Sequence, residues 1–304
     1  MSAPAQSATQ NFAVQHQPPQ HVIDQILNRV GQVRMLPEVA IKALQIARDP
    51  NVNFKQFGGI VEKDVTLTTR VLAMANSSLF AAGGSTASVA QGVSRLGFRQ
   101  CKNIIISTCL ASTMKAIVAR EQVLREALWN HSLTTAVTAK HLAEKLDLDF
   151  SGEEFTAGLI HDFGRLLLAT TFPKSEGYRD RISFAELPNQ REIEIESIGC
   201  CHCTAGTWFG MDQGLPQELL AVIKYHHTPE ESVYCPELVA VVALADEIAG
   251  LIQAERPETF SPEKSLGIAA LENCGVNRVG ERLELSFQWL LDSVEVSVQE
   301  MHDH

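Results

Sequence analysis

Histidine and aspartate residues in the second half of the chain have the types and order of a metal-ligand set. Imidazole nitrogens and carboxylate oxygens, without thiolates, suit iron, manganese, zinc, nickel or cobalt. An aspartate can also bridge two cations, because its two oxygens are separately available. The candidates are a single histidine, a His-Asp dipeptide, a second histidine, a His-His pair and a second aspartate: His131, His161, Asp162, His202, His226, His227 and Asp246.

Two of these candidates are carboxylates in apolar surroundings. Leucine, isoleucine and phenylalanine flank the His161-Asp162 dipeptide, and Asp246 follows the apolar run 238–245. Because burial of an uncompensated carboxylate is costly, either a metal ion or a tight hydrogen-bond network must hold each one. Taken singly, a His-Asp dipeptide can lie on a helix surface, and a His-His pair can simply end a helix.

The segments that must position these side chains have the periodicity of helices. Apolar residues recur at intervals of three and four, and strict two-residue alternation does not persist. We therefore predict an all-α protein in which each candidate lies on or at the end of a different helix, as in bundles with an internal metal site. The predicted helices of the second half span about 128–145, 153–171, 192–209, 215–227, 236–254 and 278–300.

The first half is also predicted to be helical. Asn53 can cap one short helix and Thr66 the next, and Gly97 interrupts a longer helical pattern. The run 103–110 could form a buried strand, but its place inside that longer pattern favours a helix. No glycine-rich phosphate loop or Gly-x-Ser-x-Gly sequence occurs, so the main sequence motifs that would indicate a nucleotide-binding α/β fold or an α/β-hydrolase are missing.

The sequence divides into four predicted parts. Residues 1–20 carry no charged side chain and are expected to form a flexible tail. One helical lobe is predicted over 21–119, and a second, with all the candidate ligands, over 120–255. A helical extension over 256–304 is expected to cover the second lobe or a partner.

The amino-acid composition limits which binding partners are expected. The 304 residues include 25 Lys and Arg against 36 Asp and Glu, a net charge of −11, so no broad basic surface for duplex nucleic acid or anionic membranes is expected. No membrane-spanning or secretory segment is recognisable, which predicts a cytoplasmic protein. The odd, irregular set of seven cysteines predicts reduced thiols.

Two weaker features have simpler interpretations. The run Cys200-Cys201-His202-Cys203 could indicate a zinc cluster, but four adjacent residues cannot easily surround one ion, so packing of small residues beside His202 is expected. His141 lies ten residues beyond His131 and is expected to be solvated, because that spacing rotates it away from the ligand face.

Together, these motifs resemble the HD superfamily of metal-dependent phosphohydrolases, whose motif is His, His-Asp, Asp on a helical scaffold. The segments 128–132, 158–166 and 214–227 are similar to the HDOD subfamily in particular. The likeness extends over about 29–254 and implies a two-lobed helical fold. Further HDOD-like residues in the first half are Leu36-Pro37, Asp49-Pro50, Glu62-Lys63-Asp64, 67–70, 75–77 and Leu96-Gly97.

The resemblance also implies roles for the candidate ligands. By likeness to the related HD-GYP phosphodiesterases, one ion is held by His131, His161, Asp162 and Asp246. A second is held by His202, His226 and His227, with Asp162 bridging the two. Iron or manganese is then favoured over zinc, nickel or cobalt.

The chain departs from the HD-GYP pattern at two points. The Gly-Tyr-Pro element is missing, and Gly164-Arg165 replaces the expected Gly-Lys, which counts against cleavage of a cyclic dinucleotide. Arg165 follows Asp162 by about one helical turn and is a candidate substrate contact, although a basic residue on a helix often serves only solvation.

Two functions follow as hypotheses. The first is a bacterial signalling protein that acts mainly through protein interaction, with a kinase, response regulator or cyclic-dinucleotide enzyme as partner in trans. The second is a metal-dependent phosphohydrolase acting on a nucleotide or cyclic dinucleotide, in which paired ions activate water and Asp162 bridges them. The signalling function is favoured, because the HDOD likeness covers both lobes. The enzymatic hypothesis rests on the second lobe alone.

Overall fold

The computed structural model describes residues 17–30, 37–47, 49, 51–76, 84–116, 122–150, 152–178 and 189–302. Within these ranges every regular element is a helix, which confirms the all-α prediction. The predicted tail at 1–16, Leu36 and Pro50 lie outside the described residues. The helices are α2 (Gln20–Val30), α3 (Glu38–Ile46), α4 (Phe54–Val61), α5 (Val65–Ala75), α6 (Val89–Ala116), α7 (Gln122–Lys145), α8 (Glu153–Ile160), α9 (Phe163–Thr171), α10 (Gln190–Ile198), α11 (His202–Asp212), α12 (Gln217–Tyr225), α13 (Pro236–Gln253), α14 (Leu266–Asn273), α15 (Val279–Glu284) and α16 (Phe287–His302), with short 3₁₀ turns η1 (Pro229–Glu231), η2 (Pro257–Thr259) and η3 (Pro262–Lys264).

Local signals explain several helix boundaries in the first half. Asn53 caps α4 through a reciprocal capping box with Gln56, as predicted. The predicted cap at Thr66 is wrong, because the Asp64 side chain accepts the Leu67 N–H and Thr66 already lies inside α5. Gly97 interrupts α6 with a φ of 76°, and 103–110 is helical as expected.

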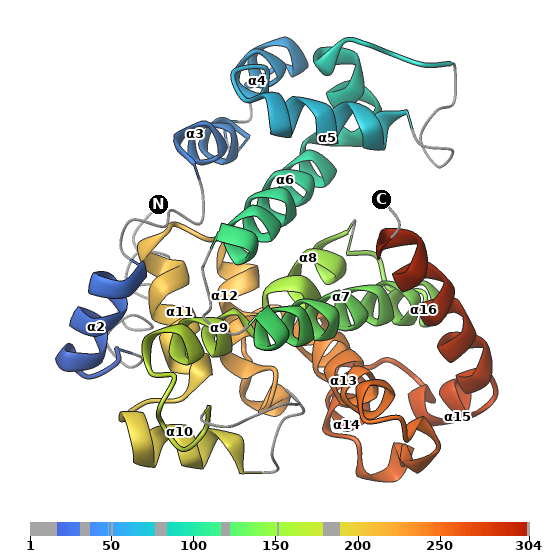
Figure 1. Cartoon of the computed structure of the whole chain (residues 1–304). Helices are drawn as coiled ribbons and strands as arrows, with labels where there is room; N and C mark the ends of the chain where they lie inside the picture. The colour runs from blue at the N-terminus through green and yellow to red at the C-terminus, as the bar shows by residue number, and fades with distance from the viewer. Residues whose placement is uncertain are drawn as a thin grey trace, which may run out of the picture.

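Two groups of helices are visible (Figure 1): α3, α4 and α5 lie at one end, and α6 connects them to the larger group formed by α7 to α16. Helix α2 packs on α9 of the larger group. The predicted lobe boundaries near residues 119 and 255 stay predictions. Helix α16 packs along α7 and buries Leu290 and Val294, so the C-terminal extension covers the helix that carries His131.

The centre of the larger group is the apolar helix α13. It packs against α7, α8, α12 and α14, and Val239 through Val242 are completely buried. Helix α14 approaches so closely that a Cβ on Gly267 would lie 2.5 Å from the Leu244 nitrogen. None of the described helices has the length and apolar character needed to cross a membrane, and the seven cysteines are free thiols.

Candidate metal centre

Helix ends supply most of the candidate ligands. His161-Asp162 is the break between α8 and α9, which the sequence predicted as one continuous helix. His202 begins α11, and His226-His227 directly follow α12. His131 and Asp246 instead come from the interiors of the long helices α7 and α13. The structure thus brings side chains from five separate segments to one interior point.

Glycines allow the helices to approach closely enough for this convergence. A Cβ on Gly158 would lie 2.7 Å from the Ala136 Cα, where α8 crosses α7. A Cβ on Gly164 would lie only 2.0 Å from the His202 carbonyl oxygen, where α9 meets α11. Because real Cβ atoms do not approach other atoms this closely, glycine is required at both crossings.

One half of the centre surrounds the Oδ2 atom of Asp162. His131 Nε2 lies 3.9 Å and His161 Nε2 lies 3.8 Å from this oxygen. The second carboxylate, Asp246, places Oδ1 2.9 Å from His131 Nε2 and 3.4 Å from His161 Nε2. We call these four residues the first half-site; it offers two imidazoles and two carboxylates.

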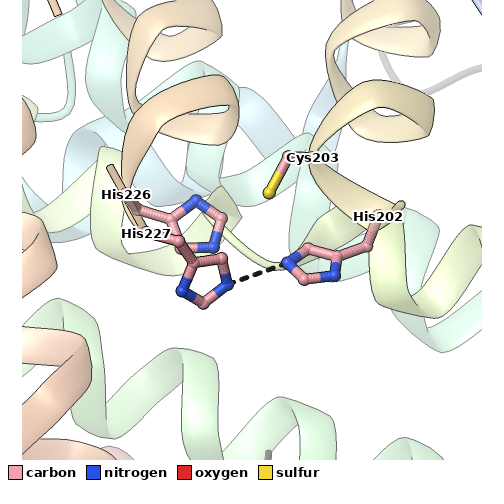
Figure 2. Close-up of side chains that lie close together, drawn as sticks. All are labelled: His202, Cys203, His226 and His227. Carbon is pink, nitrogen blue, oxygen red and sulfur yellow. Dashed lines mark hydrogen bonds between the residues drawn. The ribbon is translucent and has the colours of Figure 1, made fainter. Parts of the chain in front are cut away.

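The other half surrounds the Oδ1 atom of Asp162. His202 Nε2 and His226 Nε2 each lie 3.6 Å from it. Figure 2 shows the His202 and His227 rings meeting through their Nε2 atoms, which lie 3.0 Å apart, with the ring planes nearly perpendicular. We call His202, His226 and His227, with Oδ1 of Asp162, the second half-site. Asp162 therefore lies between the two half-sites, with one oxygen directed to each.

Cys203 lies beside the second half-site. Its sulfur belongs to a group with His202, His226 and His227 whose potential ligand atoms all lie within 4.8 Å of one another (Figure 2). The sequence prediction treated this cysteine as packing next to His202, and it is indeed buried. The structure adds that it faces the histidine group.

Hydrogen bonds at Nδ1 orient three of the imidazoles. His161 Nδ1 donates to the Gly158 carbonyl oxygen at 2.7 Å, and His226 Nδ1 donates to the carbonyls of Val222 and Ile223 at 3.1 Å. His202 Nδ1 donates to Glu194 Oε2 at 2.7 Å. Each ring therefore directs Nε2 toward Asp162, which is the orientation that metal-binding histidines take from their outer contacts.

Glu194 holds His202 in place and was not predicted from the sequence. It is completely buried, and its Oε2 also accepts the His202 backbone N–H at the start of α11. Its Oε1 accepts hydrogen bonds from Tyr178 at 2.5 Å and Gln190 at 3.0 Å. Nothing in the local sequence distinguishes Glu194 from its exposed neighbours Glu192 and Glu196, so this role could not be predicted from pattern alone.

Electrostatics keep the carboxylates of the centre ionised. Burial raises the pKa of Asp162, but the Arg165 guanidinium and His161 outweigh burial and hold this pKa well below its usual range. Burial also raises the pKa of Asp246, but the hydrogen bond from His131 and the nearby His161 imidazole outweigh burial and hold this pKa well below its usual range. Burial alone would raise the pKa of Glu194, but its contact with His202 lowers that pKa to about 2.

The histidines differ in charge. Burial opposes protonation of His161, but Asp162 and Asp246 raise its pKa to about 9. Burial and the adjacent His227 lower the pKa of His226 to about 4. At neutral pH His161 is therefore a cation between two carboxylates, and His226 is neutral.

The donor set fits a divalent transition-metal ion. Asp162 Oδ1, His161 Nε2 and His226 Nε2 are buried and have no hydrogen-bond partner among the described residues. Buried polar atoms of this kind are costly unless a ligand satisfies them. Imidazole nitrogens and carboxylate oxygens at these separations can each supply a coordination bond.

Arg165 and His141, the other two basic residues considered in the sequence, are both largely covered by the protein. Arg165 is 1% exposed, and its Nη1 donates to Asp162 Oδ2 at 2.7 Å. A substrate contact by Arg165 therefore stays a prediction. His141 was expected to be solvated, but this is wrong: its side chain is 15% exposed and hydrogen-bonded to Ser297 beside Trp289, because α16 covers it.

Replacement of Glu194 by glutamine is expected to weaken metal binding at the second half-site about 10- to 100-fold, the usual effect of losing a carboxylate behind a metal-binding histidine. The neutral amide of glutamine attracts the His202 Nδ1–H less strongly than the carboxylate does. The His202 Nε2 atom therefore becomes a weaker metal ligand. Manganese titration of the purified chain measures the change. The matched control is Glu196→Gln, an exposed glutamate on the same helix; equal weakening in both variants would contradict the role of Glu194.

Metal affinity at the first half-site is expected to rise with pH up to about 9. Because His161 must lose its proton before Nε2 can bind a cation, lowering the pH below its pKa of about 9 favours the protonated, metal-free form. One released proton corresponds to about tenfold in affinity per pH unit. Calorimetry in buffers of different ionisation enthalpy measures that proton, and a pH-independent affinity between 6 and 9 would refute its release.

Comparison with known proteins places the chain in a family. The HDOD domain model matches residues 33–229, well over half of the chain. A protein of Treponema pallidum (strain Nichols), named only as uncharacterized, is 23% identical over 260 residues, which cover 82% of this chain and 48% of that protein. The chain thus spans about half the length of the curated relative it matches.

Solved structures share the fold. An HDOD domain protein of unknown function from Geobacter sulfurreducens has a TM-score of 0.61 at 22% identity, covering 91% of this chain and 98% of its own. A protein of Shewanella amazonensis SB2B, described as a candidate metal-dependent phosphohydrolase, has a TM-score of 0.56 at 18% identity, covering 92% and 98%. The helical architecture, the ordered His and Asp motifs and the family match agree, and the chain belongs to the HDOD domain family.

Proposed function

We propose that this protein is a metal-binding regulatory HDOD protein that acts mainly through contacts with other proteins. The observation that carries the proposal is the deep burial of the side chains in the middle of the candidate metal centre. His161 and His202 expose none of their surface, and Asp162 exposes 2%. Structural metal sites are closed, whereas catalytic sites keep a coordination position open to substrate.

The contacts around Asp162 support the same proposal. Arg165, the candidate substrate contact in the sequence, forms an ion pair with Asp162 inside the protein. An ion held here would link α7, the α8–α9 junction, α11, α12 and α13. Metal occupancy would then determine how firmly these helices hold together, and hence which surface a partner meets.

The metal and partner classes are part of the proposal. One or two divalent ions are expected, with iron or manganese ahead of zinc, nickel or cobalt. The partners would be signalling proteins supplied in trans, such as a kinase, a response regulator or a cyclic-dinucleotide enzyme. The family match and a structural relative from Marinobacter aquaeolei VT8, described as a candidate signal transduction protein, are the support for this class.

A metal-dependent phosphohydrolase is the second candidate function, because Asp162 directs one oxygen to each half-site. Bound divalent ions would supply Lewis acidity and a water nucleophile at neutral pH. In that case the histidine Nε2 atoms would hold the ions, and the substrate would be a phosphorylated nucleotide. Its route to the centre would pass His227 and Asp246, the least buried of the seven residues.

The deciding experiment combines metal analysis with two functional assays. Anaerobically purified protein is expected to contain stoichiometric metal, to retain a specific signalling partner in an affinity pull-down, and to show no turnover in a phosphodiesterase screen with iron or manganese restored. Robust turnover without a specific partner would reverse the ranking of the two functions. Absence of metal would reject the metal centre on which both functions depend.

A further inference from the structure

The two oxygens of Asp162 have unequal partners. Oδ2, which faces the first half-site, accepts a charge-assisted hydrogen bond from Arg165 Nη1 at 2.7 Å. Oδ1, which faces the second half-site, has no hydrogen-bond partner among the described residues. The same carboxylate is therefore compensated on one side and available to a cation on the other.

Asp246, the other carboxylate of the first half-site, also accepts a hydrogen bond. His131 Nε2 donates to Asp246 Oδ1 at 2.9 Å, and His161 Nε2 lies 3.4 Å from the same oxygen. A cation that enters here must share Oδ2 with a buried guanidinium of like charge and break the bond between His131 and Asp246. Hydrogen bonds to an ionised carboxylate are about twice as strong as neutral ones, and the guanidinium repels a second cation, so both contacts oppose binding.

The second half-site requires less rearrangement. His226 Nε2 is buried and has no hydrogen-bond partner among the described residues, and it lies 3.6 Å from Asp162 Oδ1. His202 and His227 share one hydrogen bond between ring nitrogens, at 3.0 Å. Glu194 already fixes the His202 ring. A cation would replace the bond between the two imidazoles and would satisfy two unsatisfied atoms, His226 Nε2 and Asp162 Oδ1, whereas the first half-site offers one such ligand atom, His161 Nε2.

From these contacts we propose that the two half-sites load in order: the second half-site binds a divalent ion first and more tightly, and Arg165 weakens binding at the first half-site. The inference rests on the metal centre of the proposed function. Arg165 is a positioning residue here, because it acts through Asp162 Oδ2. Its guanidinium stays charged at every relevant pH, so the difference between the half-sites is permanent.

Manganese titration of the full chain, followed by calorimetry and by the EPR signal of free Mn²⁺, tests this order. The wild-type protein is expected to bind in two steps of different affinity. His227→Ala should remove the tight step, and Asp246→Asn should remove the weak one. Arg165→Gln should strengthen the weak step about tenfold or more and bring the two steps together. Arg165→Lys keeps the charge and should preserve the separation.

Each result decides between distinct conclusions. Two equal steps in the wild type, loss of the weak step in His227→Ala, or an unchanged separation in Arg165→Gln would overturn the proposed order. If the folded wild type binds no Mn²⁺ at all, the metal centre itself fails and the order fails with it. If Arg165→Gln does not fold, the His227→Ala and Asp246→Asn pair still decides the order, because both variants keep the Arg165–Asp162 contact.

Discussion

The Asp162→Asn variant is expected to lose divalent metal almost completely, with affinity at both half-sites reduced by more than about 100-fold. Both oxygens of this side chain face the ligand group, Oδ2 toward His131 and His161 and Oδ1 toward His202 and His226. Asparagine keeps the shape but removes the negative charge that a dication needs in order to bind among these imidazole rings. Elemental analysis of protein purified without chelators measures the loss.

Two controls separate loss of metal from loss of fold. Asp212→Asn removes an exposed carboxylate at the end of α11 and should leave metal content unchanged. Asp162→Asn alone leaves the buried Arg165 guanidinium without its carboxylate, which costs about 3–5 kcal/mol. The double variant Asp162→Asn with Arg165→Gln removes both charges and should recover much of that stability without recovering metal. Full metal in the folded double variant would show that Asp162 is not a ligand.

Gly164→Ala is expected to destabilise the protein by about 3 kcal/mol or more. The new Cβ would lie 2.0 Å from the His202 carbonyl oxygen and 2.7 Å from its carbonyl carbon, both backbone atoms that cannot rotate away. Helices α9 and α11 would have to separate, and that motion also carries His202 away from Asp162. Urea unfolding measures the stability, and manganese titration of the remaining folded protein measures the centre.

The matched control for this substitution is Gly59→Ala. Gly59 lies exposed in α4, and a Cβ there would meet nothing within 4 Å. Alanine should stabilise a helix at such a position by up to about 1 kcal/mol. If Gly164→Ala were as stable as the control, the close crossing of α9 and α11 would be refuted.

The sequence by itself predicted the fold class and the group of side chains that come together. Helical periodicity and the absence of alternation predicted an all-α chain, because a helix buries one face through residues three and four apart, which is a local property. The seven candidate ligands were identified by residue type and by apolar surroundings, and the HDOD likeness rested on the order of their motifs. The Asn53 cap was predictable for the same local reason.

Only the tertiary structure decided how those side chains are held. The predicted helix over 153–171 breaks at His161-Asp162, and Glu194 rather than its neighbours Glu192 and Glu196 supports His202. The partner of each Asp162 oxygen, including Arg165, also became visible only in the fold. The reason is physical: burial, hydrogen-bond partners and the charge of a carboxylate depend on which distant helices approach it, and glycine crossings set that approach.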